Sequence, residues 1–238
     1  MTTDSRRSAA LPLGLAVPDW SARPLPPRKV LEGRYCRLEP LDVAKHGNDL
    51  VAAFSVTDPA SWTYMPLESF GSEDDFRRWL ADAAGRQDVY YALVDLKTGK
   101  AAGVASYMRI DSANGVIEVG GIHYSDRLKR THATTEAMFL MMRHVFEDLG
   151  YRRYEWKCNS FNEPSRRTAL RLGFQYEGIF RQHMVAKGHN RDTAWFAIID
   201  SEWPTLKKAY EQWLSPQNFD DDGTQRESLA NLIAAARK

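Results

Sequence analysis

The segment of residues 118–137, EVGGIHYSDRLKRTHATTEA, constrains the fold of this chain more than any other stretch. It begins with the alternation of a strand and contains Gly120 and Gly121, and glycine within a strand marks a bulge or the close approach of another backbone or a ligand. A basic turn over residues 125–130 then leads into a helix, because apolar residues recur every three or four positions. The first N–H groups of a helix lack intrahelical partners, so this turn is a candidate phosphate site. The competing interpretation is an ordinary strand and helix joined by a solvated charged turn.

Composition predicts a soluble globular protein of one domain with terminal extensions. The 238 residues are 43% hydrophobic and 26% charged, with a net charge of +1, so neither nucleic acid nor an anionic membrane is an expected partner. No stretch approaches the roughly 20 apolar residues of a membrane-spanning helix. Cys36 and Cys158 lie far apart in strand-like segments, which favours buried free thiols over a disulfide. No Cys/His spacing resembles a zinc site, so no metal is expected.

The N-terminal sequence has a weak likeness to an export signal. Arg6 and Arg7 precede an apolar run, but the run is short and is broken by Pro12 and Gly14, without a clear cleavage site. We therefore expect a cytoplasmic protein.

Five prolines mark residues 1–29 as an irregular arm, and we expect a domain over 30–200 and a C-terminal helical extension over 201–238. Antiparallel strands come first and a strand–helix–strand unit follows, which is typical of an α+β fold with a mixed sheet. Strands are predicted at 30–40, 89–94, 102–110, 116–122, 151–158, 174–180 and 184–199, the last with an interruption at Gly188. Helices are predicted at 42–54, after Ser72, and at 133–149, 162–172, 204–214 and 228–237.

Residues 30–200 resemble the GCN5-related N-acetyltransferase (GNAT) superfamily, in the branch of the ribosomal-protein alanine acetyltransferases. Three pieces carry the resemblance: the segment 118–137 with its Thr-Glu-Ala end, the Asn-Glu-Pro-Ser of 162–165 with the Leu-Gly-Phe of 172–174, and the last strand with Arg-Asp-Thr at 191–193. The resemblance implies a mixed, mostly antiparallel sheet with splayed central strands, flanked by helices. Without the resemblance, Asn162 and Gly173 indicate only the cap and the end of a helix.

The resemblance also implies a site for acetyl-CoA, with its pantetheine arm between the splayed strands. The phosphate loop of the family usually reads Arg/Gln-x-x-Gly-x-Gly/Ala, and alignment on Thr-Glu-Ala places it at residues 129–134. His132 and Thr134 then replace both glycines, so we expect their side chains to crowd the loop. The residues implied to bind acetyl-CoA are Gly121, Ile122, Tyr124, Lys129, Arg130, Thr131, His132, Ala133, Thr134, Asn162, Ser165 and Arg166.

Acetyl transfer to an amine needs a base, because the amine must lose a proton to attack. Glu118 on the bulged strand is the first candidate, since related enzymes often use a glutamate there; its alternative is an ion pair with a neighbouring arginine or exposure to solvent. His123 is the second candidate because of its intrinsic pKa, and its alternative is a hydrogen-bonded strand histidine. The family's usual tyrosine acid is absent, because Ala169 occupies that position.

The resemblance therefore implies an acetyl-CoA-dependent N-acetyltransferase whose acceptor is a primary amine of a peptide or a small molecule. A non-catalytic acyl-CoA-binding sensor with the same fold is the alternative. A nucleic-acid or ribosome-binding module is a third class, which the small net charge disfavours. The sequence leaves the oligomeric state open between monomer and homodimer.

Overall fold

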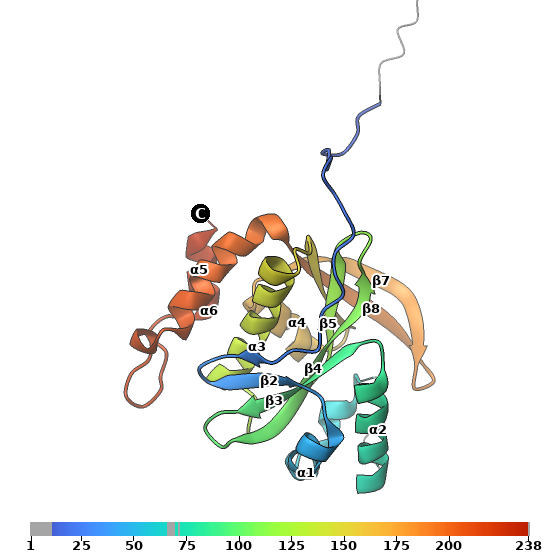
Figure 1. Cartoon of the computed structure of the whole chain (residues 1–238), viewed down its shortest axis with the longest axis vertical. Helices are drawn as coiled ribbons and strands as arrows, with labels where there is room; N and C mark the ends of the chain where they lie inside the picture. The colour runs from blue at the N-terminus through green and yellow to red at the C-terminus, as the bar shows by residue number, and fades with distance from the viewer. Residues whose placement is uncertain (1–10, 66–69, 71, 238) are drawn as a thin grey trace, which may run out of the picture.

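The computed structural model of the chain describes residues 11–65, 70 and 72–237, and its centre is an eight-stranded sheet (Figure 1). The strand order is β1-β2-β3-β4-β5-β6-β8-β7, and every pair of strands in the described residues except β5–β6 is antiparallel. The predicted mixed, mostly antiparallel sheet is confirmed. The strands are β1 Leu31–Glu32, β2 Cys36–Pro40, β3 Val89–Asp95, β4 Lys100–Asp111, β5 Val116–Tyr124, β6 Arg153–Asn159, β7 Gln175–Ala186 and β8 His189–Ile199.

The helices begin and end largely at the residues that the sequence marks. Asp42 caps the first by accepting a hydrogen bond from the Ala44 N–H at 2.8 Å, and Ser72 caps the second through the Asp75 N–H at 3.1 Å. Gly173, at φ +94°, follows the end of the fourth. The helices are α1 Val43–Phe54, α2 Glu73–Gly85, α3 His132–Arg143, continued by a π-helical turn at His144–Asp148, α4 Glu163–Arg171, α5 Trp203–Leu214 and α6 Leu229–Ala236.

Helices cover both faces of the first half of the sheet, so its strands are apolar on both sides. Tyr91 and Leu93 of β3 belong to the core under α3, whereas Tyr90 and Val94 belong to a second core with α1 and α2. In Figure 1, α1 and α2 lie beside β3 and β4, and β7 forms the edge of the sheet opposite β1. We use "open face" for the side of β5, β6, β8 and β7 opposite the α3 core; it carries Glu118, Glu155, Lys157 and Trp195.

The β7–β8 hairpin has the predicted interruption at Gly188 but lacks the predicted break at 181–183. β7 continues to Ala186, and the chain turns at Lys187 and Gly188, which have φ values of +51° and +73°. The predicted break at 181–183 is a bulge, because the pairing register shifts between Phe180 and Met184. Asp192 of β8 holds this bulge by accepting the Gln182 N–H at 2.7 Å.

The terminal segments pack on the domain through aromatic side chains. In the described part of the arm, the Trp20 indole donates to the Ala113 carbonyl at 2.7 Å and lies so close to Gly115 that a Cβ there would overlap its ring. The Tyr210 hydroxyl of α5 donates to the Leu172 carbonyl at 2.8 Å, and its ring stacks on Phe139 of α3. Residues 1–10, including the twin arginines, lie outside the described residues.

Both cysteines are buried and free, as predicted. Within the residues the structure describes, no helix has the length and apolar character needed to cross a membrane, and no group of three or more His, Cys, Asp or Glu side chains is arranged to hold a metal ion.

Candidate functional site

The predicted bulge lies at Gly121. Ser106 of β4 pairs with Gly120 and Val104 pairs with His123, so Gly121 and Ile122 together oppose a single residue of β4. Gly121 has φ +58°, and a Cβ there would stand 3.0 Å from the hydroxyls of Ser106 and Tyr90. Both the left-handed backbone and the close approach therefore require glycine.

Beyond this point β5 and β6 stop pairing with each other. Their parallel register begins at Val116 opposite Arg153 and ends at Val119 opposite Trp156. Each strand stays paired on its other side, β5 with β4 as far as Tyr124 and β6 with β8 as far as Asn159. The two facing edges therefore present backbone N–H and C=O groups that no strand in the described part of the chain satisfies. This is the splayed arrangement that the sequence analysis expected.

The N-terminus of α3 lies at the same end of the sheet and leaves its first N–H groups available. Thr131 occupies the cap position but makes no capping hydrogen bond with its side chain, because its hydroxyl donates to the Leu128 carbonyl at 2.7 Å. Lys129 and Arg130 precede it, and Lys129 pairs with Asp126 at 2.6 Å. Free N–H groups, the helix dipole and nearby cations make this turn suited to an anion.

His132 and Thr134 do not crowd this turn, contrary to expectation. Both lie within α3, and the His132 ring packs against Phe219 at 4.0 Å and Tyr35 at 5.0 Å between ring centroids. The Thr134 hydroxyl donates to the Thr131 carbonyl at 2.9 Å. The residue with a left-handed backbone in the turn is Arg130, at φ +62°. The backbone that suits glycine is thus at residue 130, two residues before His132, the first glycine position of the alignment.

Other residues expected to bind acetyl-CoA are held by contacts within the protein or are buried. Asn162 caps α4 by accepting the Ser165 N–H at 3.1 Å, and the Ser165 hydroxyl accepts the Trp156 indole N–H at 3.0 Å. Arg166 lies 3.4 Å from Glu163. Tyr124 is packed against the core, where burial raises the pKa of its hydroxyl. Ala133 is buried in α3.

Glu118 lies on β5 next to the point where β5 and β6 part, and its residue is only 2% exposed. Its Oε1 accepts from Arg109 Nη1 at 2.7 Å, and its Oε2 lies 2.9 Å from Lys157 Nζ. This second distance is that of an ion pair, yet Oε2 has no hydrogen bond of good geometry within the described residues. The expected alternative, an ion pair with a neighbouring arginine, is present, and Oε2 keeps capacity to accept a proton or a hydrogen bond.

His123 lies beyond the bulge in an aromatic environment and is 5% exposed. Its ring stacks on Trp62 at 3.8 Å and packs against Phe54 at 4.7 Å. Burial, with the charge of Lys129 adding to it, lowers the pKa of His123 to about 4, so the imidazole is neutral at physiological pH. Its Nε2 is buried without a hydrogen-bond partner among the described residues.

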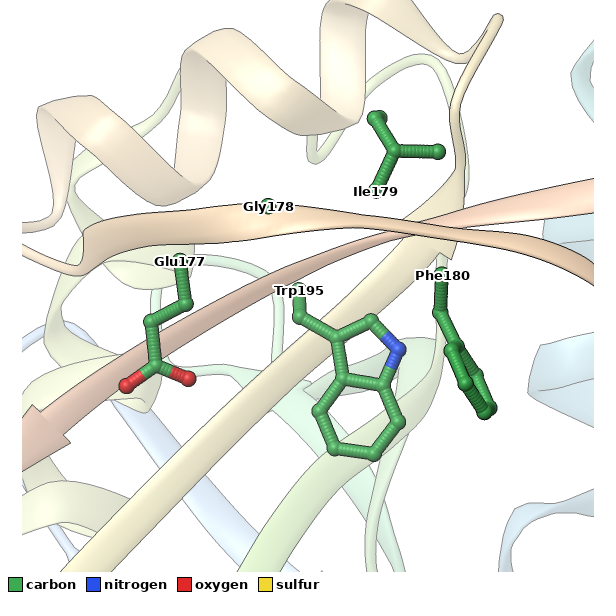
Figure 2. Close-up of a pocket in the computed structure, with 5 residues that line it drawn as sticks. All are labelled: Glu177, Gly178, Ile179, Phe180 and Trp195. Carbon is green, nitrogen blue, oxygen red and sulfur yellow. The ribbon is translucent and has the colours of Figure 1, made fainter.

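Sequence reasoning missed the residues that surround Glu118 on the open face. Lys157, whose side chain is 7% exposed, also contacts Glu155 at 2.7 Å and lies 3.8 Å above the centre of the Trp195 ring. Beside it is an open cavity of about 370 Å³ lined by Trp195, Phe180 and Glu177 together with Gly178 and Ile179. Figure 2 shows Ile179 on one side of the hairpin and Glu177, Phe180 and Trp195 on the other. The alternating charges of Arg153, Glu155 and Lys157 were the available signal.

Comparison with known proteins agrees with this geometry. Residues 37–175, more than half of the chain, match the family model described as Acetyltransferase (GNAT) domain. A GCN5-related N-acetyltransferase from Brucella melitensis has a solved structure with a TM-score of 0.90 and 51% identity, over 92% of this chain and 100% of that chain. The "Uncharacterized N-acetyltransferase p20" of Bacillus licheniformis is 29% identical over 155 residues, which are 62% of this chain and 84% of that protein. The "Putative ribosomal N-acetyltransferase YdaF" of Bacillus subtilis (strain 168) is 26% identical over 129 residues, 54% of this chain and 67% of that protein.

Proposed function

The chain belongs to the GNAT acetyltransferase family and is thereby an acyltransferase, and we propose that it transfers the acetyl group of acetyl-CoA to a primary amine. The observation that carries the proposal is the parting of β5 and β6 at the Gly121 bulge, next to the N-terminus of α3. We propose residues 30–200 as the catalytic domain, 1–29 as its arm and 201–238 as its extension. The two buried free thiols are in keeping with a reducing compartment, and we propose the cytoplasm.

The described residues suit acetyl-CoA. The N–H groups of residues 131–134, with the charges of Lys129 and Arg130, can bind its phosphates. The unpaired edges of β5 and β6 offer backbone partners for the amides of its pantetheine arm. The side-chain amide nitrogen of Asn162, whose oxygen is used in the helix cap, remains as a donor.

We propose a role in acetyl transfer for groups on the open face and at the bulge. Glu118 is the proposed base, because it lies on β5 next to the last residues that pair with β6 and its Oε2 keeps acceptor capacity. The N–H groups of Gly121 and Ile122 are the proposed donors to the oxyanion. Tyr90 has its hydroxyl beside Gly121, and burial raises its pKa, so it stays protonated and is the proposed hydrogen-bond donor to the departing thiolate, which takes its proton from solvent.

The structure weakens the argument for a non-catalytic sensor. That alternative rested on the altered phosphate loop and on the missing tyrosine acid. The His132 and Thr134 side chains make other contacts, which removes support from the first argument, whereas Ala169 still occupies the position of the tyrosine. The acceptor itself stays open between a protein N-terminus and a small-molecule amine.

Acetyl-CoA is expected to raise the melting temperature of the protein. A ligand at 100 times its Kd that binds only the native state adds about 2.7 kcal/mol, which corresponds to about 5–10 °C in a chain of this size. Differential scanning fluorimetry measures the shift, with sodium acetate at the same concentration as a control that should give none. The absence of a shift at millimolar acetyl-CoA would contradict the proposed function.

Lys129→Ala combined with Arg130→Ala is expected to weaken CoA binding at least about tenfold, because charge-assisted contacts to phosphate are lost. The affinity for pantetheine, which has no pyrophosphate, should not change. Isothermal titration gives both constants, and Arg226→Ala, which removes an exposed arginine of the extension, is the matched control. Equal losses for CoA and pantetheine would show that the two residues support the fold instead.

A further inference from the structure

The open face around Glu118 carries one more cation than its carboxylates balance. Arg109, Lys157 and Arg153 are in ion pairs with Glu118, Glu155 and Glu177. Arg191 lies on the same face of β8 as Trp195, and its side chain makes no ion pair or hydrogen bond within the described part of the chain. Four cations therefore face three carboxylates, and Arg191 is the one without a partner there.

Two buried donors on this face also lack acceptors. Arg191 Nε and Trp195 Nε1 are buried with no hydrogen-bond partner in the described residues. Both groups donate and cannot accept. Arg191 and Trp195 are four residues apart on one strand, so their side chains emerge on the same face. The chemistry that satisfies them is a set of acceptor oxygens with negative charge.

These donors adjoin the proposed reaction centre through a chain of contacts. Trp195 pairs in register with Lys157 across β8 and β6, and Lys157 Nζ lies over the Trp195 ring. Lys157 in turn contacts Glu118, the proposed base. His183, which also faces the group, donates to or accepts from Thr193 Oγ1 at 2.9 Å, and burial together with the nearby cations lowers its pKa, which keeps it neutral.

We propose that the amine acceptor carries an anionic group, a carboxylate or a phosphate, and that Arg191 and the indole N–H of Trp195 bind it. The inference rests on the proposed function, because it places the acceptor amine at Glu118. The cavity of about 370 Å³ beside Trp195 is the size of a small-molecule site, and Phe180 gives it an apolar wall (Figure 2). Arg191 is then a specificity-determining residue: because of it, the protein binds an amino acid or an aminoalkyl phosphate more tightly than the corresponding neutral amine.

The test is a binding experiment that needs no turnover. Isothermal titrations of the CoA-saturated protein compare the common L-amino acids with their amides, and phosphoethanolamine with ethanolamine. At least one anionic member should bind at least about tenfold more tightly than its neutral partner, the effect of a charge-assisted contact. The two arms distinguish a carboxylate from a phosphate as the preferred group.

Variants test which residues cause the tighter binding of anionic amines. Arg191→Gln should abolish it, Arg191→Lys should keep part of it because the charge remains, and Trp195→Phe should reduce it while keeping an aromatic ring under Lys157. Arg226→Gln removes the same charge from the exposed loop of the extension and should leave it intact. Each variant is checked for its melting temperature and its acetyl-CoA affinity, so a folding defect is not mistaken for lost recognition.

The outcomes separate this inference from the proposed function. If no anionic member binds more tightly than its neutral partner, or if the preference survives in Arg191→Gln, the inference is overturned even when acetyl-CoA binds and neutral amines are acetylated. If acetyl-CoA itself fails to bind, the proposed function fails.

Discussion

Glu118→Gln is expected to lower kcat by about 10²–10⁴ at neutral pH, the usual contribution of a general base. Glutamine keeps the volume of the side chain and its hydrogen bond from Arg109, so the affinity for acetyl-CoA should be unchanged. Activity should recover in part at high pH, because more of the acceptor amine is then already neutral. A pH–rate profile with saturating acetyl-CoA measures both effects.

Glu155→Gln is the matched control for this prediction. Glu155 is also buried and also contacts Lys157, but it lies on β6 and its second partner is Arg153. Both variants remove one carboxylate from the same buried group of charges, so both should lower the melting temperature. If kcat falls equally in the two and follows the melting temperature, Glu118 is a structural partner of its cations. If Glu118→Gln is as active as the parent across the pH range, His123 becomes the next candidate base.

Glu136→Ala is expected to destabilise the protein by about 3 kcal/mol, taking about 1 kcal/mol for each of the three backbone hydrogen bonds that are lost. The Glu136 carboxylate of α3 accepts three backbone hydrogen bonds from the β1–β2 turn, from Arg34 at 2.8 Å, Tyr35 at 2.6 Å and Cys36 at 2.9 Å. Its oxygens fill the space that a Cβ on Gly33 would occupy. This carboxylate therefore joins α3 to the edge of the sheet.

The melting temperature should accordingly fall by about 6–12 °C, at about 2–4 °C for each kcal/mol. The melting temperature of Glu136→Gln should lie between those of the parent and Glu136→Ala, because the glutamine amide offers one oxygen in place of two. Glu163→Ala removes an exposed carboxylate at the start of α4 and should cost less than about 1 kcal/mol. A drop of under 2 °C for Glu136→Ala would show that water replaces the carboxylate at no cost to the fold.

Local chemistry was sufficient to predict most of the elements and the bulge. The adjacent glycines placed an irregularity in β5, and only Gly121 uses a left-handed backbone there. Asp42, Ser72 and Asn162 marked helix starts because their side chains accept N–H groups within three residues. Caps and glycine turns depend on residues that are close together in the chain, so they can be predicted from a single sequence.

The composition of the site was decided by the tertiary structure. Lys157, Arg191 and Trp195 come together because β6 and β8 pair in a fixed register, and that register depends on strands far apart in the sequence. The contacts of His132 depend on Phe219 and Trp213 of the extension, and the bulge that keeps β7 continuous depends on Asp192 of the neighbouring strand. The sequence determined where most of the helices begin and which residues can carry charge. Only the packing of distant strands determined which charges are paired and which donors remain free, because side-chain partners across a sheet are set by register and not by spacing along the chain.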